Sequence, residues 1–209
     1  MPRVVNKRRK AEAIGRAALQ TFRKAGYHRA RMADIAQAAG IGKGTLYEYF
    51  EDKADVLRFV FDGYFDAFKE GALRAMQSAA SPRARLLALL DFAFEHVSEW
   101  EDHCAVYVDY FGAARVGDDK LFSLTKIYDD MGALLRALIE QAQAADEVAE
   151  GVDAVATAEL LLSMFDGVVL HGILGGRGCG RAALRAAAVQ LMTEGLFAGA
   201  RPGADPGTS

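Results

Sequence analysis

The chain has 209 residues, of which 52% are apolar, and a formal net charge of −3. This length allows one or two ordinary domains, and the two cysteines, Cys104 and Cys179, are too few and too isolated for a disulfide framework or a zinc site. The first residues lack the basic, apolar and small-residue segments of an export signal, so we expect a cytoplasmic protein. We also expect no metal and no cofactor.

The charge is distributed unevenly along the chain. Residues 1–60 hold thirteen Lys and Arg against six Asp and Glu, whereas residues 61–209 hold twelve against twenty-two. A basic end attracts nucleic acid because it displaces the counterions that are condensed on the phosphates, and an acidic remainder is repelled. The pattern favours a DNA-binding end, with a merely solvated basic face as the alternative.

The predicted elements begin with a basic segment. Residues 2–9 are polar and show no apolar period, so we expect a flexible arm that adds phosphate or minor-groove contacts. From Lys10 to Ala25 apolar residues recur in steps of three and four, which predicts an amphipathic helix that ends at Gly26.

The helical period continues to the end of the chain, and no segment alternates in the way that strands do. We therefore predict an all-α fold of about nine helices. Further helices are expected over 32–39, 43–50, 52–75, 83–101, 104–114, 121–144, 152–174 and 181–198. The predicted organisation is a flexible arm (1–9), a helix-turn-helix domain (10–57), a ligand-binding and dimerisation domain (58–199) and a disordered tail (200–209).

The segment 154–174 is the most apolar, and its length raises the possibility of a membrane span. Glu159, Asp166 and His171 argue against a span, because each is costly in hydrocarbon. A helix that is apolar nearly all round is otherwise buried, and we expect it to pair with the last helix in a four-helix bundle between two subunits. The predicted dimer interface comprises Leu161, Phe165, Val168, Leu184, Ala188, Leu191 and Met192.

The most specific motif is a helix, a glycine turn and a second helix over residues 32–50. Apolar side chains such as Ile35, Leu46 and Phe50 would lock the two helices together and onto the first helix. The remaining side chains of the second helix would then face the major groove, with a glycine that lets the backbone approach DNA and a lysine at the start of the next helix. The predicted contacts are Lys43, Gly44, Thr45, Tyr47, Tyr49 and Lys53.

Four of these contacts have a simpler alternative. Tyr47 and Tyr49 could be packing residues, and Lys43 and Lys53 could be solvated.

The segment from Lys10 to Leu57 resembles the DNA-binding domain of the tetracycline-repressor (TetR) family of bacterial regulators. The matching residues are Ile35-Ala36, Gly40, Lys43-Gly44-Thr45-Leu46-Tyr47, Tyr49-Phe50 and Lys53. This chain has Arg31 and Gly42 where the family commonly has capping Thr and Ser residues, and we expect Arg31 to contact phosphate instead. The resemblance implies a homodimeric repressor that binds a palindromic operator in double-stranded DNA.

The resemblance also implies a cavity for a small effector within the C-terminal helices. Such pockets are mostly apolar, so we expect a small, largely apolar effector that mis-spaces the two DNA-binding heads. The predicted lining is Phe92, Trp100, Tyr107, Tyr110, Phe111, Met131 and Phe165, with His96, His103, Asp109 and Asp166 as polar candidates. The alternative for this aromatic set is an ordinary core.

Three rival functions remain. An enzyme is disfavoured because no nucleophile and base pair and no phosphate-binding loop is recognisable, so we predict no catalytic residues. A non-specific architectural DNA protein would not need so large an apolar body. A transcriptional activator of the same family fits the sequence as well as a repressor does.

Overall fold

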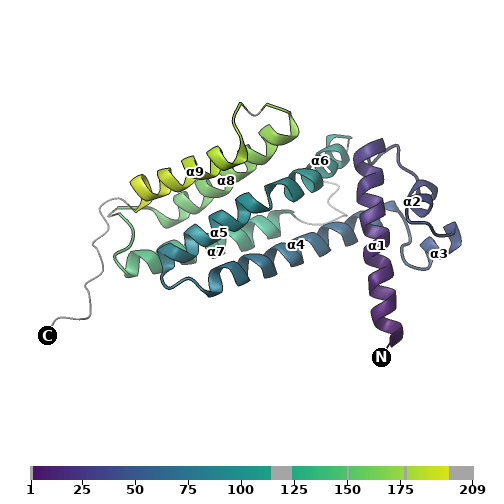
Figure 1. Ribbon diagram of the computed structural model, residues 1–209, viewed down its shortest axis with the longest axis horizontal. Coiled ribbons are helices and arrows are strands. Elements are labelled where there is room, and N and C mark those ends of the chain that lie inside the picture. The colour runs from purple at the N-terminus through teal and green to yellow at the C-terminus, as the bar shows by residue number, and fades with distance from the viewer. Residues whose placement is uncertain (1, 114–123, 150, 177, 198–209) are drawn as a thin grey trace. The chain divides into compact units, whose positions relative to one another are not determined.

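The computed structural model describes residues 2–113, 124–149, 151–176 and 178–197, with side chains from Lys7 to Tyr110 and from Lys126 onward. Within these ranges the chain forms nine α-helices and no strand (Figure 1). The predicted all-α fold is confirmed. The predicted tail over 200–209 and the end of the helix predicted at 104–114 lie outside the described residues.

The helices follow the predicted order, with some changes in their bounds. They are α1 (Pro2–Ala25), α2 (Met32–Ala38), α3 (Lys43–Tyr47), α4 (Lys53–Gln77), α5 (Pro82–Glu95), α6 (Val97–Ala113), α7 (Leu124–Ala144), α8 (Ala154–Ile173) and α9 (Arg181–Leu191), and a single π-helical turn, η1 (Met192–Leu196), follows α9.

The chain divides into two compact units, which we describe separately. Unit 1 comprises residues 1–68 and 99–123, and unit 2 comprises residues 69–98 and 124–209. Unit 1 therefore contains α6 in addition to the helix-turn-helix segment, because the end of α6 packs against the turn between α1 and α2. The long helix α4 contributes its first part to unit 1 and its last part to unit 2.

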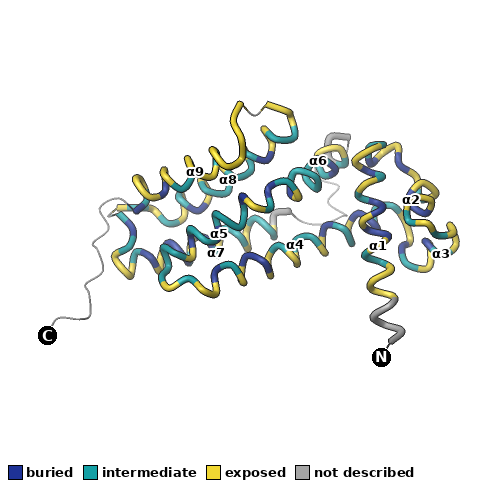
Figure 2. Tube along the Cα trace, viewed as in Figure 1, coloured by how far each residue is buried: buried dark blue, intermediate teal, exposed yellow. Residues whose placement is uncertain are grey.

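The core of unit 1 joins the helix-turn-helix to the helices on either side of it. Figure 2 shows the buried positions of α1, α2 and α3 facing one another. Burial of each large side chain stabilises the fold by about 1.5–3 kcal/mol. The fully buried residues are Ile14, Ala18 and Phe22 of α1, Ile35 of α2, Leu46 of α3, and Val56, Leu57 and Phe61 of α4.

Two glycines make the turns of this unit. Gly26 has a φ of +83° and Gly40 has a φ of +65°. A side chain at such angles is strained, whereas glycine adopts them readily, so α1 and α2 can each end in a tight turn. The predicted helix stops at both positions are confirmed.

Unit 2 has its own apolar core, in which α7 packs against α5 and α8. The caps are those that the sequence favours: the Ser81 hydroxyl accepts from Ala84 N at the start of α5, and the Asp153 carboxylate accepts from Val155 N at the start of α8. The core comprises Ala72, Met76, Leu86, Leu89, Leu135, Leu138, Ile139, Ala142, Val148, Ala158, Met192 and Phe197.

Two predicted elements were wrong. Residues 2–9 are not a flexible arm but the first turns of α1, which begins at Pro2, a residue well suited to the first helical position. The helix predicted over 83–101 ends at Glu95, because His96 leaves the helical conformation (φ −98°, ψ 5°), and α6 begins at Val97.

Two glycines of α4 offer a matched test of packing. A Cβ built on the buried Gly71 lies 2.5 Å from Cζ of Phe92, whereas one built on the exposed Gly63 meets nothing within 4 Å. We expect Gly71→Ala to lower the free energy of unfolding by about 1–3 kcal/mol through overpacking. Gly63→Ala should instead raise it by up to about 1 kcal/mol through helix propensity.

Urea unfolding followed by circular dichroism measures both changes. Equal stability of the two variants would show that the Phe92 ring moves aside without cost.

Candidate nucleic-acid interface and effector region

The start of α3 is open to solvent. A Cβ built on Gly42 or Gly44 meets nothing within 4 Å, and the Lys43 side chain between them is exposed. Leu46, on the opposite side of the same helix, is completely buried. The helix therefore presents its N-terminal end and one face outward, as a recognition helix of a helix-turn-helix must.

Arg31 occupies the N-cap position of α2, and its side chain is exposed. It lacks a capping hydroxyl, but its backbone N–H donates to Oδ2 of Asp34 at 2.9 Å. This contact satisfies one of the free amides at the helix start, as the acidic partner of a capping box does. The guanidinium lies on the surface, and the sequence predicts that it contacts a phosphate.

The two tyrosines that follow are in different environments. Tyr47 is 48% exposed, and the Lys43 Nζ lies 5.9 Å from its ring centroid. Tyr49 is only partly exposed, and its ring lies 5.8 Å from Nζ of both Lys7 and Lys10 of α1. These distances are within the range of cation–π contacts. Tyr47 is available to a partner, whereas Tyr49 already holds two cations.

Lys53 is occupied within the protein. Its Nζ donates to the carbonyl oxygens of Tyr27 at 2.6 Å, Ala30 at 3.1 Å and His28 at 3.2 Å. An ammonium group has three N–H donors, so none remains for a phosphate. Burial lowers the pKa of Lys53, and the nearby Asp109 carboxylate partly opposes that shift. These bonds give Lys53 a structural role in the turn after α1, and its contact with DNA stays a prediction.

A second set of contacts joins the same turn to α6. The Asp109 carboxylate accepts from Tyr27 N at 2.5 Å. His28 Nε2 lies 3.0 Å from the carbonyl oxygen of Asp109 and 3.2 Å from that of Tyr110. Because both oxygens can only accept, this nitrogen carries the proton. We call the contacts of Lys53 and Asp109 with residues 26–30 the α1–α2 joint.

Aromatic side chains pack around this joint. The Tyr110 ring is parallel to the His28 ring at 6.4 Å and packs edge-on against Tyr27 at 4.9 Å. Burial, with smaller effects from Tyr110 and Asp52, raises the pKa of Tyr27 to about 12. The sequence analysis missed the joint because Tyr27 and Asp109 are 82 residues apart, and nothing local marks either as a partner.

A second group of rings lies between α4 and α6. In this α4–α6 aromatic cluster the Tyr64 ring stacks on His103 at 4.1 Å and is parallel to Trp100 at 5.5 Å. The Tyr64 hydroxyl is buried and has no hydrogen-bond partner among the described residues. Burial raises the pKa of Tyr64 and lowers that of His103. The members are Phe61, Tyr64, Phe65, Trp100, His103 and Tyr107.

The structure does not gather the predicted effector residues at one described site. Trp100 and Tyr107 belong to the α4–α6 aromatic cluster, whereas Tyr110 and the polar candidate Asp109 belong to the α1–α2 joint. The side chain of Phe111 lies outside the described residues. The other predicted members lie in unit 2 and are partly buried: Phe92, Met131 and Phe165, with the polar candidate His96 against Phe92.

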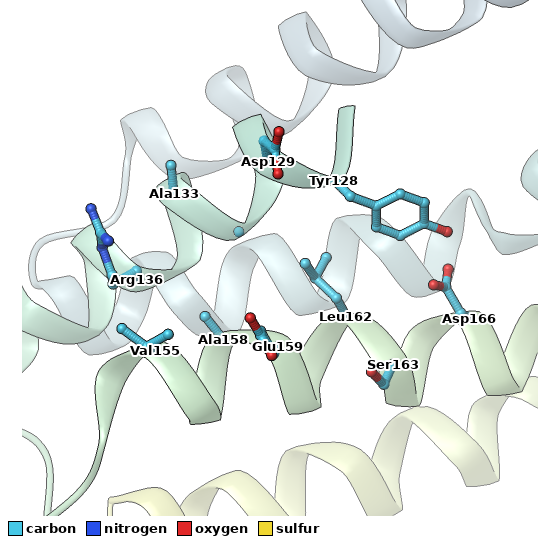
Figure 3. A pocket seen from close by; sticks show the side chains of 11 residues that line it. Tyr128, Asp129, Ala133, Arg136, Val155, Ala158, Glu159, Leu162, Ser163 and Asp166 are labelled. Atoms are coloured by element: carbon cyan, nitrogen blue, oxygen red, sulfur yellow. The ribbon is translucent and has the colours of Figure 1, made fainter. Parts of the chain in front are cut away.

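Unit 2 has an open groove of about 470 Å³ between α7 and α8. Figure 3 shows Tyr128 of α7 extending toward Asp166 of α8. Burial raises the pKa of Asp166, and a hydrogen bond from Tyr128 opposes the shift. Of the predicted residues only the polar candidate Asp166 lines this groove. Its other lining residues include Asp129, Arg136, Val155, Glu159, Leu162 and Ser163.

Apolar side chains are exposed on α8 and at the end of α9. Leu160 and Met164, four residues apart on α8, are 59% and 40% exposed, and Leu174, the C-cap residue of α8, is 71% exposed. Of the predicted interface, Leu191 is 62% exposed, whereas Met192 is 6% exposed. Met192 is therefore corrected to a core residue of its own unit. The remaining predicted residues are partly buried: Leu161, Phe165, Val168, Leu184 and Ala188.

The helix α8 is also, among the described residues, the one helix that is long and apolar enough to cross a membrane by length and composition alone. The core helix of a soluble protein passes the same test, so one such helix is weak evidence for a span. No group of three or more His, Cys, Asp or Glu within the described ranges is placed to hold a metal ion.

Two family descriptions match the chain. Residues 14–60 match the bacterial regulatory proteins of the tetR family, and residues 82–196 match the C-terminal domain of BetI-type transcriptional repressors. Among curated relatives, the fatty acid metabolism regulator protein of Bacillus subtilis (strain 168) is 22% identical over 190 residues. That alignment covers 91% of this chain and 97% of the relative.

Solved structures share the fold at low sequence identity. A transcriptional regulator from Saccharomonospora viridis in complex with choline superimposes with a TM-score of 0.76 at 20% identity, covering 89% of this chain and 96% of that one. The regulator FadR from Bacillus subtilis in complex with stearoyl-CoA has a TM-score of 0.71 at 22% identity, with coverages of 88% and 98%. At this identity the likeness establishes the fold alone.

The BetI-type match spans more than half of the chain, and the tetR match coincides with the open helix-turn-helix of α2 and α3. The chain belongs to the TetR family of bacterial regulatory proteins, and it is a DNA-binding regulator of transcription rather than an enzyme.

Proposed function

We propose that this protein is a cytoplasmic, ligand-responsive repressor that binds a palindromic operator as a homodimer and is released by a small, largely apolar effector. The observation that carries the proposal is the open N-terminal end of α3, where Lys43 is exposed between two glycines whose surroundings are empty. Such an end can enter a major groove without displacing any part of its own unit.

The side chains at this end of α3 differ in the groups of DNA that they can contact. Lys43 and Tyr47 are exposed on α3, and Thr45, which is partly buried, lies between them. A lysine or a hydroxyl can donate to phosphate or to acceptors on base edges, so these residues supply both positioning and readout. Arg31, exposed at the start of α2, supplies a phosphate contact, and Gly44 allows close approach of the backbone.

Two substitutions test this interface. We expect Lys43→Ala and Tyr47→Ala each to weaken operator binding by about 10- to 100-fold, because each removes a base or phosphate contact of about 1–3 kcal/mol. Fluorescence anisotropy at one salt concentration measures the change, with a duplex selected from random sequence by the full-length protein.

The exposed Lys69 of α4 provides the control, since Lys69→Ala should bind as the wild type does. An α3 variant that also binds as the wild type does is not a DNA contact.

The dimer is proposed to form through α8 and α9. Leu160 and Met164 expose large apolar areas four residues apart on α8, Leu174 does so at the C-cap of that helix, and Leu191 does so at the end of α9. Exposure of such a stripe to water is unfavourable, and a stable interface of about 800 Å² per subunit would cover it. This arrangement accounts for the strong hydropathy of α8 without a membrane.

A charge in the middle of this face should separate the subunits. We expect Met164→Asp to give a monomer in sedimentation velocity with an unchanged helical circular dichroism spectrum, because an unpaired carboxylate is costly at an apolar interface. Operator affinity should fall with it, since one head contacts only one half-site.

Leu73→Asp, at a leucine of α4 that is 46% exposed, is the matched control and should leave the assembly unchanged. A Met164→Asp protein that sediments as the wild type does would rule out this face.

The effector is proposed to contact the α4–α6 aromatic cluster. A buried hydroxyl without a partner costs about 1–3 kcal/mol, so a ligand that accepts from Tyr64 would recover that cost while its apolar part packs on the rings. The structural neighbours with choline and stearoyl-CoA support a ligand-binding role for this fold.

Release of DNA is proposed to pass through the α1–α2 joint. Trp100 and His103 of the aromatic cluster lie on α6, and the same helix holds Tyr27 and His28 through Asp109. A ligand that shifts α6 therefore acts on the turn from which α2 begins. Because coupling is reciprocal, DNA must then weaken effector binding by the same factor.

Loss of the Asp109 carboxylate should loosen the helix-turn-helix. We expect Asp109→Ala to raise the amide hydrogen-exchange rates of residues 26–50, because Tyr27 N loses its acceptor and the turn loses its hold on α6. Exchange in the core of unit 2 should not change.

Asp66→Ala, at an exposed acidic residue of α4, is the control. Identical exchange over 26–50 in both variants would contradict a coupling role for the joint.

A further inference from the structure

The first described turns of α1 carry an unusual concentration of positive charge. Lys7, Arg8, Arg9 and Lys10 are consecutive and exposed. The one acidic residue of the helix, Glu12, pairs with Arg8 at 3.0 Å. Lys7 and Lys10 have no acidic residue three or four positions away on the helix.

These cations lie close together on neighbouring turns of one helix. Cations three and four residues apart on one helix repel one another. A polyanion that bound these turns would relieve this repulsion.

Tyr49 fixes where two of these cations lie. Lys7 and Lys10 are three residues apart and share a helix face, and the Nζ of each is 5.8 Å from the Tyr49 ring centroid. The backbone of Tyr49 is fixed at the end of α3, since its N–H donates to the carbonyl oxygen of the buried Leu46 at 3.0 Å. The two ammonium groups therefore lie near the end of the recognition helix.

We infer that the basic turns of α1 form a second DNA contact, made to the phosphate backbone by Lys7 and Lys10, and that Tyr49 is the residue that positions them. This inference rests on the proposed operator-binding function and changes the role of Tyr49 within it. Tyr49 acts through the two lysines and does not read bases.

Helical geometry decides between phosphates and the minor groove. An α-helix with its side chains is about 10–12 Å wide, whereas the minor groove of B-DNA is about 6 Å wide. Because residues 7–10 belong to α1, they cannot enter that groove as the predicted flexible arm would. The backbone beside the major groove that α3 enters is the part of the duplex that fits them.

The salt dependence of binding gives a direct test. The logarithm of the binding constant falls with the logarithm of the salt concentration, with a slope of about −0.9 per phosphate contact. For the double variant Lys7→Ala/Lys10→Ala the slope should therefore become shallower by about 1.8 per bound subunit. The loss in affinity should be the same for the selected duplex and for a scrambled duplex of equal length.

Variants of Tyr49 separate positioning from readout. Tyr49→Phe keeps the ring and should bind as the wild type does. Tyr49→Leu should reproduce part of the change in slope, and it should add nothing in the Lys7→Ala/Lys10→Ala background. Lys24→Ala, at an exposed lysine of the last turn of α1, is the control and should keep the wild-type slope.

Three outcomes would overturn the inference. They are an unchanged slope in the double lysine variant, a Tyr49→Leu effect that is additive with it, or a loss confined to the selected duplex. A wild-type protein that does not prefer the selected duplex but shows the predicted change in slope would refute the operator proposal and leave this contact standing. A protein that binds no duplex at all would refute both.

Discussion

Three hydrogen bonds from one ammonium group determine how the DNA-binding helices are held. Lys53 Nζ donates to the carbonyl oxygens of Tyr27, His28 and Ala30, which lie in the turn between α1 and α2. Since α4 begins at Lys53, this contact attaches the turn before α2 to the helix after α3. The helix-turn-helix is thereby attached at both of its ends. None of these hydrogen bonds involves the outer face of α3.

The tyrosines of unit 1 illustrate how the same residue type takes different roles. Tyr27 is buried in the α1–α2 joint, and Tyr64 is partly buried in the aromatic cluster, with a hydroxyl that has no hydrogen-bond partner among the described residues. Tyr49 supports two lysines, and Tyr47 faces solvent beside Lys43. Only Tyr47 combines exposure with a place on the recognition helix, which makes it the tyrosine best suited to reach DNA.

The α6 helix connects the candidate effector residues to the DNA-binding helices within one compact unit. Trp100 and His103 contact rings of α4 near one end, and Asp109 holds the turn before α2 near the other. A helix is stiff over this length, so a displacement at one end reaches the other with little loss. The proposed transmission therefore requires no rearrangement of the core that buries Leu46 and Ile35.

The sequence by itself determined the helical class, the turns at Gly26 and Gly40, and the open recognition helix, because periodicity and glycine conformation are local properties of the chain. It also identified Lys43 and Tyr47 as exposed, since buried and exposed positions alternate predictably around a short helix. Only the tertiary structure decided that Lys53 is occupied, that Asp109 holds Tyr27, and that Met192 is a core residue. These roles depend on partners far away in the chain. A pattern of neighbouring residues carries no information about which distant group will accept a hydrogen bond or cover a side chain.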